Sequence, residues 1–130
     1  AARRGIDVRL LLPDKSDIFI IDWAALTYYK SLLKSGVRIF QYKPAVLHAK
    51  SLIIDDWMLV GSTNLNSRSL LHDLEVDAEI QTTQAKQDLH DLYIKDLSLS
   101  EEITLHNWER KHPLLKRLVG RVIIYFRYFI

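Results

Sequence analysis

Cysteine is absent from this 130-residue chain, and glycine and proline are scarce, with four and three residues. Without cysteine the chain can form no disulfide scaffold, no thiol nucleophile and no cysteine-ligated zinc site. It also contains neither GxGxxG nor GxxxxGK[ST], the glycine-rich motifs that hold nucleotide phosphates. No run of about 18 uncharged apolar residues occurs, so the sequence predicts no membrane span.

The composition is that of a globular domain, with 48% hydrophobic and 26% charged residues. The length fits one domain, or half of a larger two-lobed one. The first residues, Ala1 to Gly5, read like the end of a helix with a glycine cap, so we expect a fragment entered part-way.

Charge is distributed unevenly along the chain. Residues 1–109 carry twelve Lys/Arg against sixteen Asp/Glu, a balance of −4, whereas residues 110–130 carry six Lys/Arg and no acid. Such a basic, apolar tail fits two interpretations. It is either a helix that packs on its own domain, or a segment that lies on a membrane surface and contacts anionic lipid.

Apolar periodicity predicts strands that alternate with helices, which favours a layered α/β class. The predicted strands cover residues 6–12, 37–42, 47–55, 57–60 and 74–81, with the third and fourth forming a hairpin. The predicted helices cover residues 18–34, 84–97 and 100–110, with a last helix from Pro113 onward, and residues 66–72 are expected to be a short helical or irregular piece. Gly36 is the stop signal for the first of these helices.

The informative polar residues are His48 and Lys50, followed by Ser62 and Asn64. Side chains two apart on a strand leave the same face, so His48 and Lys50 should lie side by side. An imidazole, an ammonium, a hydroxyl and a carboxamide make a poor metal cage but suit an anionic phosphodiester. Lys50 and Asn64 can hold the non-bridging oxygens, and His48 can attack phosphorus.

A nucleophilic histidine needs a partner that orients its other ring nitrogen. Glu75, on the polar face of the strand predicted at residues 74–81, is the candidate for this role. The alternative is an ordinary solvated carboxylate, because glutamate is usually exposed.

The spacing of these residues resembles the phospholipase D superfamily, whose HKD motif is HxKxxxxD followed by a Gly-Ser segment with a nearby Asn. Here the motif reads His48, Lys50 and Asp55, then Gly61-Ser62-Thr63-Asn64. The resemblance implies that the histidine forms a phosphohistidine, that Lys50 and Asn64 bind phosphate with support from Ser62, and that Asp55 mainly supports the site. An acidic residue on a later strand, here Glu75, orients the histidine in that family.

Further segments are similar to the cardiolipin synthase branch of the superfamily, notably residues 5–13, 36–39 and 64–69. The resemblance implies a layered α/β/α phospholipase D-like half-domain with a mixed central sheet over residues 1–97, without its first strand and helix. Residues 98–130 would be a C-terminal helical segment associated with the membrane. Two departures are the five residues between Asp55 and Gly61, where six are usual, and Asn66, where many relatives have Asp.

By this resemblance the chain is expected to be the C-terminal catalytic half of a phosphatidyltransferase. This enzyme would act on anionic phospholipid at a bacterial membrane, the cytoplasmic one, without metal or cofactor. It would need a second HKD half, from the same polypeptide or a homodimer, and would be inactive alone. The alternatives are a phosphodiesterase or nuclease of the same superfamily, and a non-catalytic orphan half. The net negative body of the chain favours lipid over nucleic acid.

Overall fold

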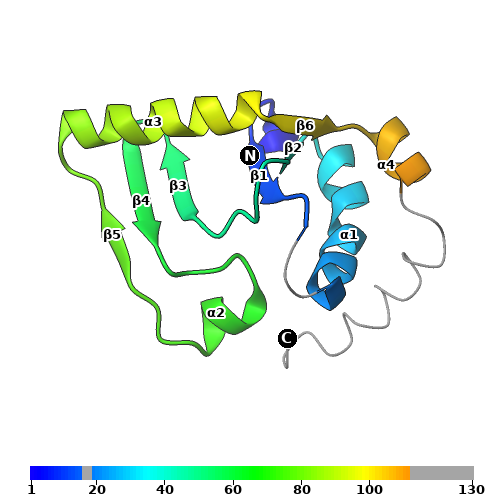
Figure 1. The fold of residues 1–130 in the computed structure, drawn as a ribbon, viewed down its shortest axis with the longest axis horizontal. Coiled ribbons are helices and arrows are strands. Elements are labelled where there is room, and N and C mark those ends of the chain that lie inside the picture. The colour runs from blue at the N-terminus through cyan, green and yellow to red at the C-terminus, as the bar shows by residue number, and fades with distance from the viewer. Residues whose placement is uncertain (16–18, 112–130) are drawn as a thin grey trace. The chain divides into compact units, whose positions relative to one another are not determined.

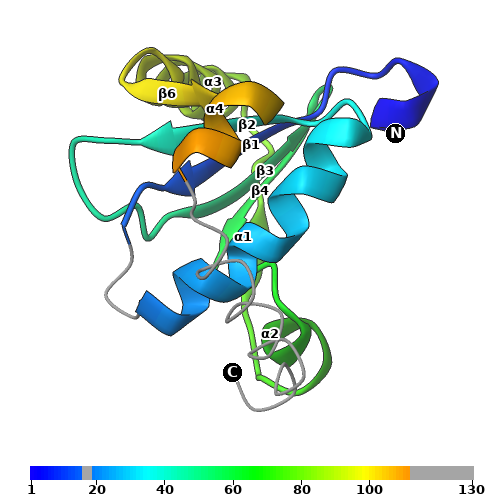
Figure 2. The ribbon, with the colours of Figure 1, turned by 90° about the vertical axis from the view of Figure 1, so that its right-hand side faces the viewer.

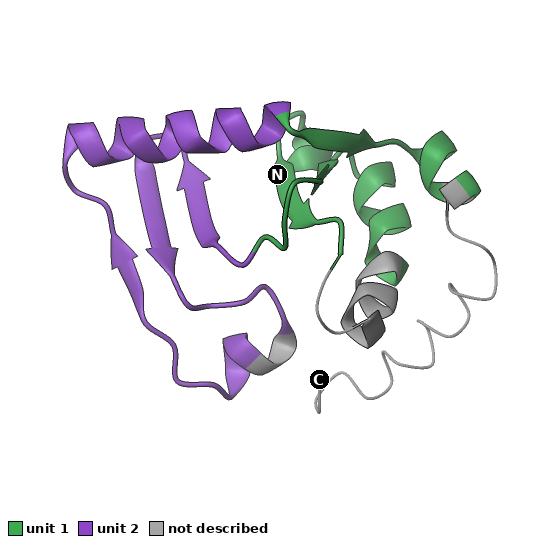
Figure 3. Cartoon of the chain, in the orientation of Figure 1, with its two compact units in different colours: residues 1–47, 99–126 green, residues 48–98, 127–130 purple. Residues whose placement is uncertain are grey.

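The computed structural model describes residues 1–15 and 19–111, which fall into two compact units. Unit 1 comprises the described residues of 1–47 and 99–126, and unit 2 those of 48–98 (Figure 3). Each unit contains one three-stranded sheet, so the predicted α/β class is confirmed, with its strands divided between two sheets. Within the described ranges, no helix is long and apolar enough to cross a membrane.

The elements follow one another along the chain as Figure 1 and Figure 2 show. In order they are a 3-10 helix at Ala2–Arg4, β1 at Arg9–Pro13, α1 at Phe19–Lys34, β2 at Arg38–Tyr42, β3 at Lys50–Ile54, β4 at Trp57–Gly61, α2 at Ser67–Leu71, β5 at Asp77–Glu79, α3 at Thr83–Ser98, β6 at Ser100–Ile103 and α4 at Leu105–Lys111. The helix predicted from Pro113 onward lies outside the described residues.

Unit 1 is built on the sheet β1–β2–β6. β1 and β2 are parallel, and α1 supplies the crossover that parallel strands require. The end of α1 is a Schellman turn, in which Val37 N–H donates to the Leu32 carbonyl at 3.1 Å and Gly36 N–H donates to that of Leu33. Gly36 has a φ of 87°, which glycine adopts without strain, so the predicted stop signal is confirmed.

The prediction of a helix over residues 100–110 is wrong in its first part. Residues 100–103 form β6, which runs antiparallel to β2 with Ile39 opposite Ile103. The helix starts only at Leu105, because Thr104 and Asn107 form a reciprocal cap. Asn107 N–H donates to Thr104 Oγ1, and the Asn107 side-chain oxygen accepts from Thr104 N–H. The division of the chain into domains at residues 97 and 98 stays a prediction.

The core of unit 1 explains why β6 joins this sheet. Its buried cluster contains Tyr29 of α1, Ile39 of β2, Ile103 of β6 and Trp108 of α4. Four distant parts of the sequence therefore remove their apolar side chains from water together, which is the main favourable term in folding. Burial of Ile103 in this cluster favours a strand at residues 100–103, although their sequence pattern resembles that of a helix.

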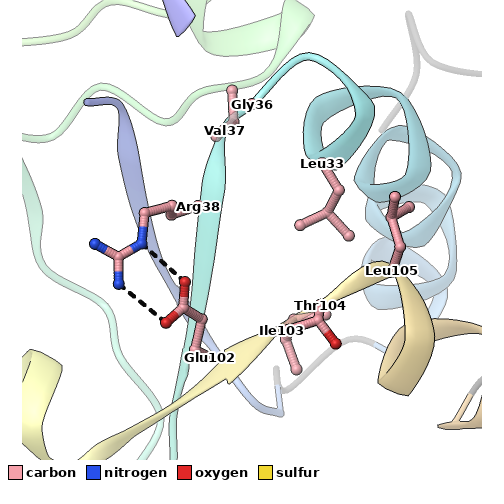
Figure 4. A pocket seen from close by; sticks show the side chains of 8 residues that line it. All are labelled: Leu33, Gly36, Val37, Arg38, Glu102, Ile103, Thr104 and Leu105. Carbon is pink, nitrogen blue, oxygen red and sulfur yellow. Dashed lines mark hydrogen bonds and ion pairs between the residues drawn. The ribbon is translucent and has the colours of Figure 1, made fainter. Parts of the chain in front are cut away.

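Charged pairs hold the polar side of β6 to β2 and its neighbours. The Arg38 guanidinium donates to both carboxylate oxygens of Glu102, at 2.8 and 3.0 Å, beside a pocket that Leu33 and Val37 also line (Figure 4). This contact holds the pKa of Glu102 below its usual range, against the opposing effect of burial. Glu102 thus joins β6 to β2 through its side chain.

Lys43, just after β2, forms ion pairs with Glu101 of β6 and with Asp14, which follows β1. Burial alone would lower the pKa of Lys43, but its contacts with Asp14 at 2.8 Å and Glu101 at 3.1 Å outweigh that effect and raise it. Such half-exposed ion pairs each stabilise a fold by only about 0.2–1 kcal/mol. They therefore favour this pairing of β2 with β6 but contribute little to overall stability.

Unit 2 contains the antiparallel sheet β3–β4–β5 with α2 and α3. The predicted hairpin is confirmed: Ile54 pairs with Trp57 across a two-residue turn, where Asp55 has a φ of 54°. Aspartate tolerates this left-handed conformation better than most residues. The strand predicted at residues 74–81 forms only at Asp77–Glu79, and Leu74 and Val76 before it are exposed.

We predict that Ile103→Ala lowers the free energy of unfolding by about 2–4 kcal/mol, because it empties a site that is 1% exposed. Urea denaturation followed by the fluorescence of the buried Trp108 measures the change. The matched control is Leu99→Ala one residue before β6, at a side chain that is 45% exposed, with an expected loss below about 1 kcal/mol. Equal, small losses in the two variants would contradict the placement of β6 in the core.

Candidate active site

The register of the sheet in unit 2 brings three strand ends together. Lys50 of β3 pairs with Gly61 of β4, and Gly61 pairs with Asp77 of β5. Because neighbouring strands are antiparallel, the start of β3, the end of β4 and the start of β5 lie at the same end of the sheet (Figure 1). The chain segments just outside these three ends carry most of the residues that the sequence singles out.

His48 and Lys50 lie at the start of β3 and contact each other directly. Lys50 Nζ is 3.0 Å from Nδ1 and 3.3 Å from Nε2 of the imidazole, and it donates to the His48 carbonyl at 2.6 Å. The imidazole is exposed and the lysine is half-buried. The structure therefore places an ammonium group beside a solvent-accessible ring nitrogen, as the two-residue spacing predicts.

Ser62 and Asn64 follow β4 in the loop that leads to α2. The Asn64 side chain is exposed, and the backbone carbonyl of Asn64 accepts from Asn66 N–H at 2.8 Å. The side-chain oxygen of Asn66 in turn accepts from Ser69 N–H at 2.7 Å, which makes Asn66 the N-cap of α2. Asn66 therefore supports the loop that presents Asn64.

Glu75 precedes β5 and contacts the same loop. Its carboxylate accepts from the Ser62 hydroxyl at 2.5 Å, while Ser62 Oγ accepts from Val76 N–H at 3.0 Å. Among the described residues, no hydrogen bond joins Glu75 to His48. The orienting role of Glu75 stays a prediction, and its observed partner is the serine expected to support phosphate binding.

Asp55 is not brought to this group of residues. It lies in the turn between β3 and β4, at the opposite end of the sheet from Lys50. Five residue steps along β3 lead from Lys50 to Asp55, which corresponds to about 16 Å at the usual rise of a strand. Asp55 forms part of the turn that connects the two strands whose register aligns the other residues.

Two residues at the site were missed from the sequence, Thr63 and Asp77. Thr63 Oγ1 donates to Asp77 Oδ2 at 2.6 Å, and Thr63 N–H donates to Asp77 Oδ1 at 3.3 Å. One signal was available, because Asp77 is two residues from Glu75 and so shares its strand face. The threonine gave none, because the pairing depends on the register of β4 and β5.

The arrangement can bind and attack an anionic phosphorus centre. One end of one sheet presents a nucleophilic imidazole, an ammonium group, a hydroxyl and an amide, all within a few residues of a strand end. Within residues 1–15 and 19–111, no group of three or more His, Cys, Asp or Glu side chains could hold a metal ion. Lys50 and Asn64 carry N–H donors of the kind that can contact phosphate oxygens.

Comparison with known proteins identifies the family of the chain. Residues 1–97 match the family model described as "Cardiolipin synthase, PLD-like domain". The chain is 34% identical over 127 residues to cardiolipin synthase A of Proteus mirabilis (strain HI4320), and 35% identical to those of Klebsiella pneumoniae (strain 342) and Salmonella arizonae. Each alignment covers 97% of this chain and 26% of the relative, so the chain spans about a quarter of the curated relatives it matches. The chain belongs to the phospholipase D-like domain family of the cardiolipin synthases.

Proposed function

We propose that this chain is the C-terminal catalytic half of a cardiolipin synthase-type phosphatidyltransferase that works through a phosphohistidine. The observation that carries the proposal is the convergence of His48, Lys50, Ser62 and Asn64 at one end of the sheet β3–β4–β5. Membership of the cardiolipin synthase domain family supports the class of reaction.

Two displacements at phosphorus make up the proposed reaction. In the first, a ring nitrogen of His48 forms a bond to phosphorus while the bond to the headgroup oxygen breaks, and that oxygen takes a proton from a general acid. In the second, the hydroxyl of an acceptor alcohol gives up its proton to the same group and attacks phosphorus, which releases His48. Lys50 and Asn64 hold the non-bridging oxygens in both steps.

The general acid in this scheme is a histidine of a second HKD motif. This sequence contains one such motif, so the proposed enzyme takes the second from the same polypeptide or from a homodimer. The exposure of His48 and Asn64 fits a site that a second half completes. We expect the 130-residue chain to be inactive by itself for this reason.

The proposed partner is an anionic phospholipid at a bacterial, cytoplasmic membrane. Residues 1–109 carry a net charge of −4, which disfavours the polyanionic backbone of a nucleic acid. The relatives are bacterial proteins. The basic tail, in which no acid follows residue 109, is suited to an anionic membrane surface.

We predict that His48→Ala in the complete protein lowers turnover by about a thousandfold or more, because the nucleophile is lost. Formation of cardiolipin from phosphatidylglycerol vesicles measures this, and acid-labile phosphate on the protein reports the intermediate. Lys50→Ala should cost about 10²–10³-fold, as expected for a lost oxyanion contact. The matched control is His90→Ala, at a half-exposed histidine on α3, which should leave turnover unchanged.

Each rival function has its own outcome in this assay. Near-normal turnover in His48→Ala would refute the proposed nucleophile. Formation of phosphatidic acid without cardiolipin, even with abundant acceptor alcohol, would identify a phosphodiesterase. A complete wild-type protein that binds the vesicles but yields no product would indicate a non-catalytic half.

A strong chelator should leave the rate of the complete enzyme unchanged, because in the proposed scheme Lys50 neutralises phosphate charge and Asn64 donates hydrogen bonds to the phosphate oxygens. The assay compares rates with EDTA and after addition of Mg²⁺, Ca²⁺ or Zn²⁺. Activity that disappears with the chelator and returns only with one of these metals would contradict the metal-free mechanism.

The tail gives a separate prediction, made from its composition because residues 112–130 lie outside the described part. Neutralising Lys116, Arg117, Arg121 and Arg127 to Gln should weaken binding to anionic vesicles at low salt, since each cation near the surface contributes about 1 kcal/mol. Co-sedimentation measures the change. The matched control replaces four cations of the body, Arg4, Lys34, Lys86 and Lys95. Unchanged binding of the tail variant, with loss of folding, would assign the tail to the core.

A further inference from the structure

The loop that follows β4 is fixed by a carboxylate that the proposed reaction does not use. Asp77, the first residue of β5, accepts from Thr63 twice, from the hydroxyl at 2.6 Å and from the backbone N–H at 3.3 Å. Thr63 stands between Ser62 and Asn64, the two residues proposed to contact phosphate. A two-point contact of this kind fixes both the side chain and the peptide plane of Thr63.

The same carboxylate also occupies the space beside Gly61. A Cβ at Gly61 would lie 1.8 Å from Asp77 Oδ1, 2.5 Å from the Val76 carbonyl and 2.7 Å from Asp77 Cα. No real Cβ makes such contacts, so a side chain at residue 61 and the present position of Asp77 exclude each other. Glycine is needed here for close approach of the two strands, and not for an unusual φ.

Backbone hydrogen bonds complete the attachment. Ser62 N–H donates to the Val76 carbonyl at 3.0 Å, and Val76 N–H donates to Ser62 Oγ at 3.0 Å. Gly61, Ser62 and Thr63 are therefore each held against the start of β5. Asn64 is the next residue, and its exposed side chain depends on this attachment for its direction.

We propose that Asp77 is a positioning residue, which holds the loop at residues 61–63 so that Asn64 and Ser62 meet the phosphate oxygens. This inference rests on the proposed function of the site. Asp77 acts through Thr63 and does not touch the substrate. Its two hydrogen bonds from Thr63 direct the carboxylate toward the loop. The negative charge of Asp77 is therefore compensated by nearby donors, although the proposed site binds an anion.

The inference predicts a specific kinetic pattern in the complete protein. Asp77→Ala should lower kcat by about 10–100-fold and change KM by less than about threefold. The reason is that misplaced hydrogen-bond donors weaken binding of the transition state more than binding of the substrate. Asp77→Asn should restore most of kcat, since its amide oxygen still accepts from the Thr63 hydroxyl. Thr63→Val should reproduce the loss.

A double-mutant cycle separates positioning from independent effects. If Asp77 acts through Thr63, the variant that combines Thr63→Val and Asp77→Ala loses no more activity than either single change. Glu79→Ala is the matched control, an exposed acid on the same strand with the same charge, and should leave kcat unchanged. Additive losses in the double variant would overturn the inference.

Two further measurements keep folding and the proposed function apart from this test. Hydrogen exchange of the Thr63 amide should become faster in Asp77→Ala, while the thermal unfolding midpoint stays close to that of Glu79→Ala. A loss of kcat that only follows the unfolded fraction would assign Asp77 a purely structural role. His48→Ala is assayed in parallel: if it is inactive while Asp77→Ala has normal kcat, the positioning role alone is refuted, and if it is active, the proposed function fails.

Discussion

The site depends on one register, in which Lys50, Gly61 and Asp77 lie side by side across three antiparallel strands. A shift of one residue would turn every side chain of a strand to the other face of the sheet. It would also separate His48, which precedes Lys50, from the loop that follows Gly61. The two-residue turn at Asp55 and Asp56 sets this register from the opposite end of β3 and β4. Asp55 of the HKD motif therefore lies in this turn, at the opposite end of β3 from Lys50.

The two units are stabilised in different ways. Unit 1 buries Tyr29, Ile39, Ile103 and Trp108 in one cluster, so its strands are held by the removal of apolar surface from water. In unit 2, Met58 is the buried apolar side chain among the described residues, and the loop beside the sheet is held by hydrogen bonds to residues 75–77. Leu65, Leu74 and Val76, which flank the proposed catalytic residues, are exposed. The geometry of the site thus depends on directional polar contacts more than on packing.

The contact between Ser62 and Glu75 links the two sides of the site. The Ser62 hydroxyl donates to the carboxylate of Glu75 and accepts from Val76 N–H, so it uses its donor and one acceptor position within the protein. With Asp77 bound to Thr63, two neighbouring loop residues are each paired with an acid from the segment 75–77. This pairing keeps two carboxylates close to the proposed phosphate site while their charge is satisfied by local donors.

The sequence by itself determined the candidate site residues, because they are identified by short spacings. His48 and Lys50 are two residues apart and lie in contact, although β3 begins only at Lys50. Gly36 ends α1 through the left-handed conformation of one residue. Only the tertiary structure decided that residues 100–103 form a strand, that Glu75 pairs with Ser62, and that Asp77 holds Thr63. Each of these features joins segments far apart in the sequence, as when Arg38 meets Glu102 across 64 residues. Local sequence patterns do not indicate such partners, because the favourable free energy of these contacts arises only when the two distant segments come together.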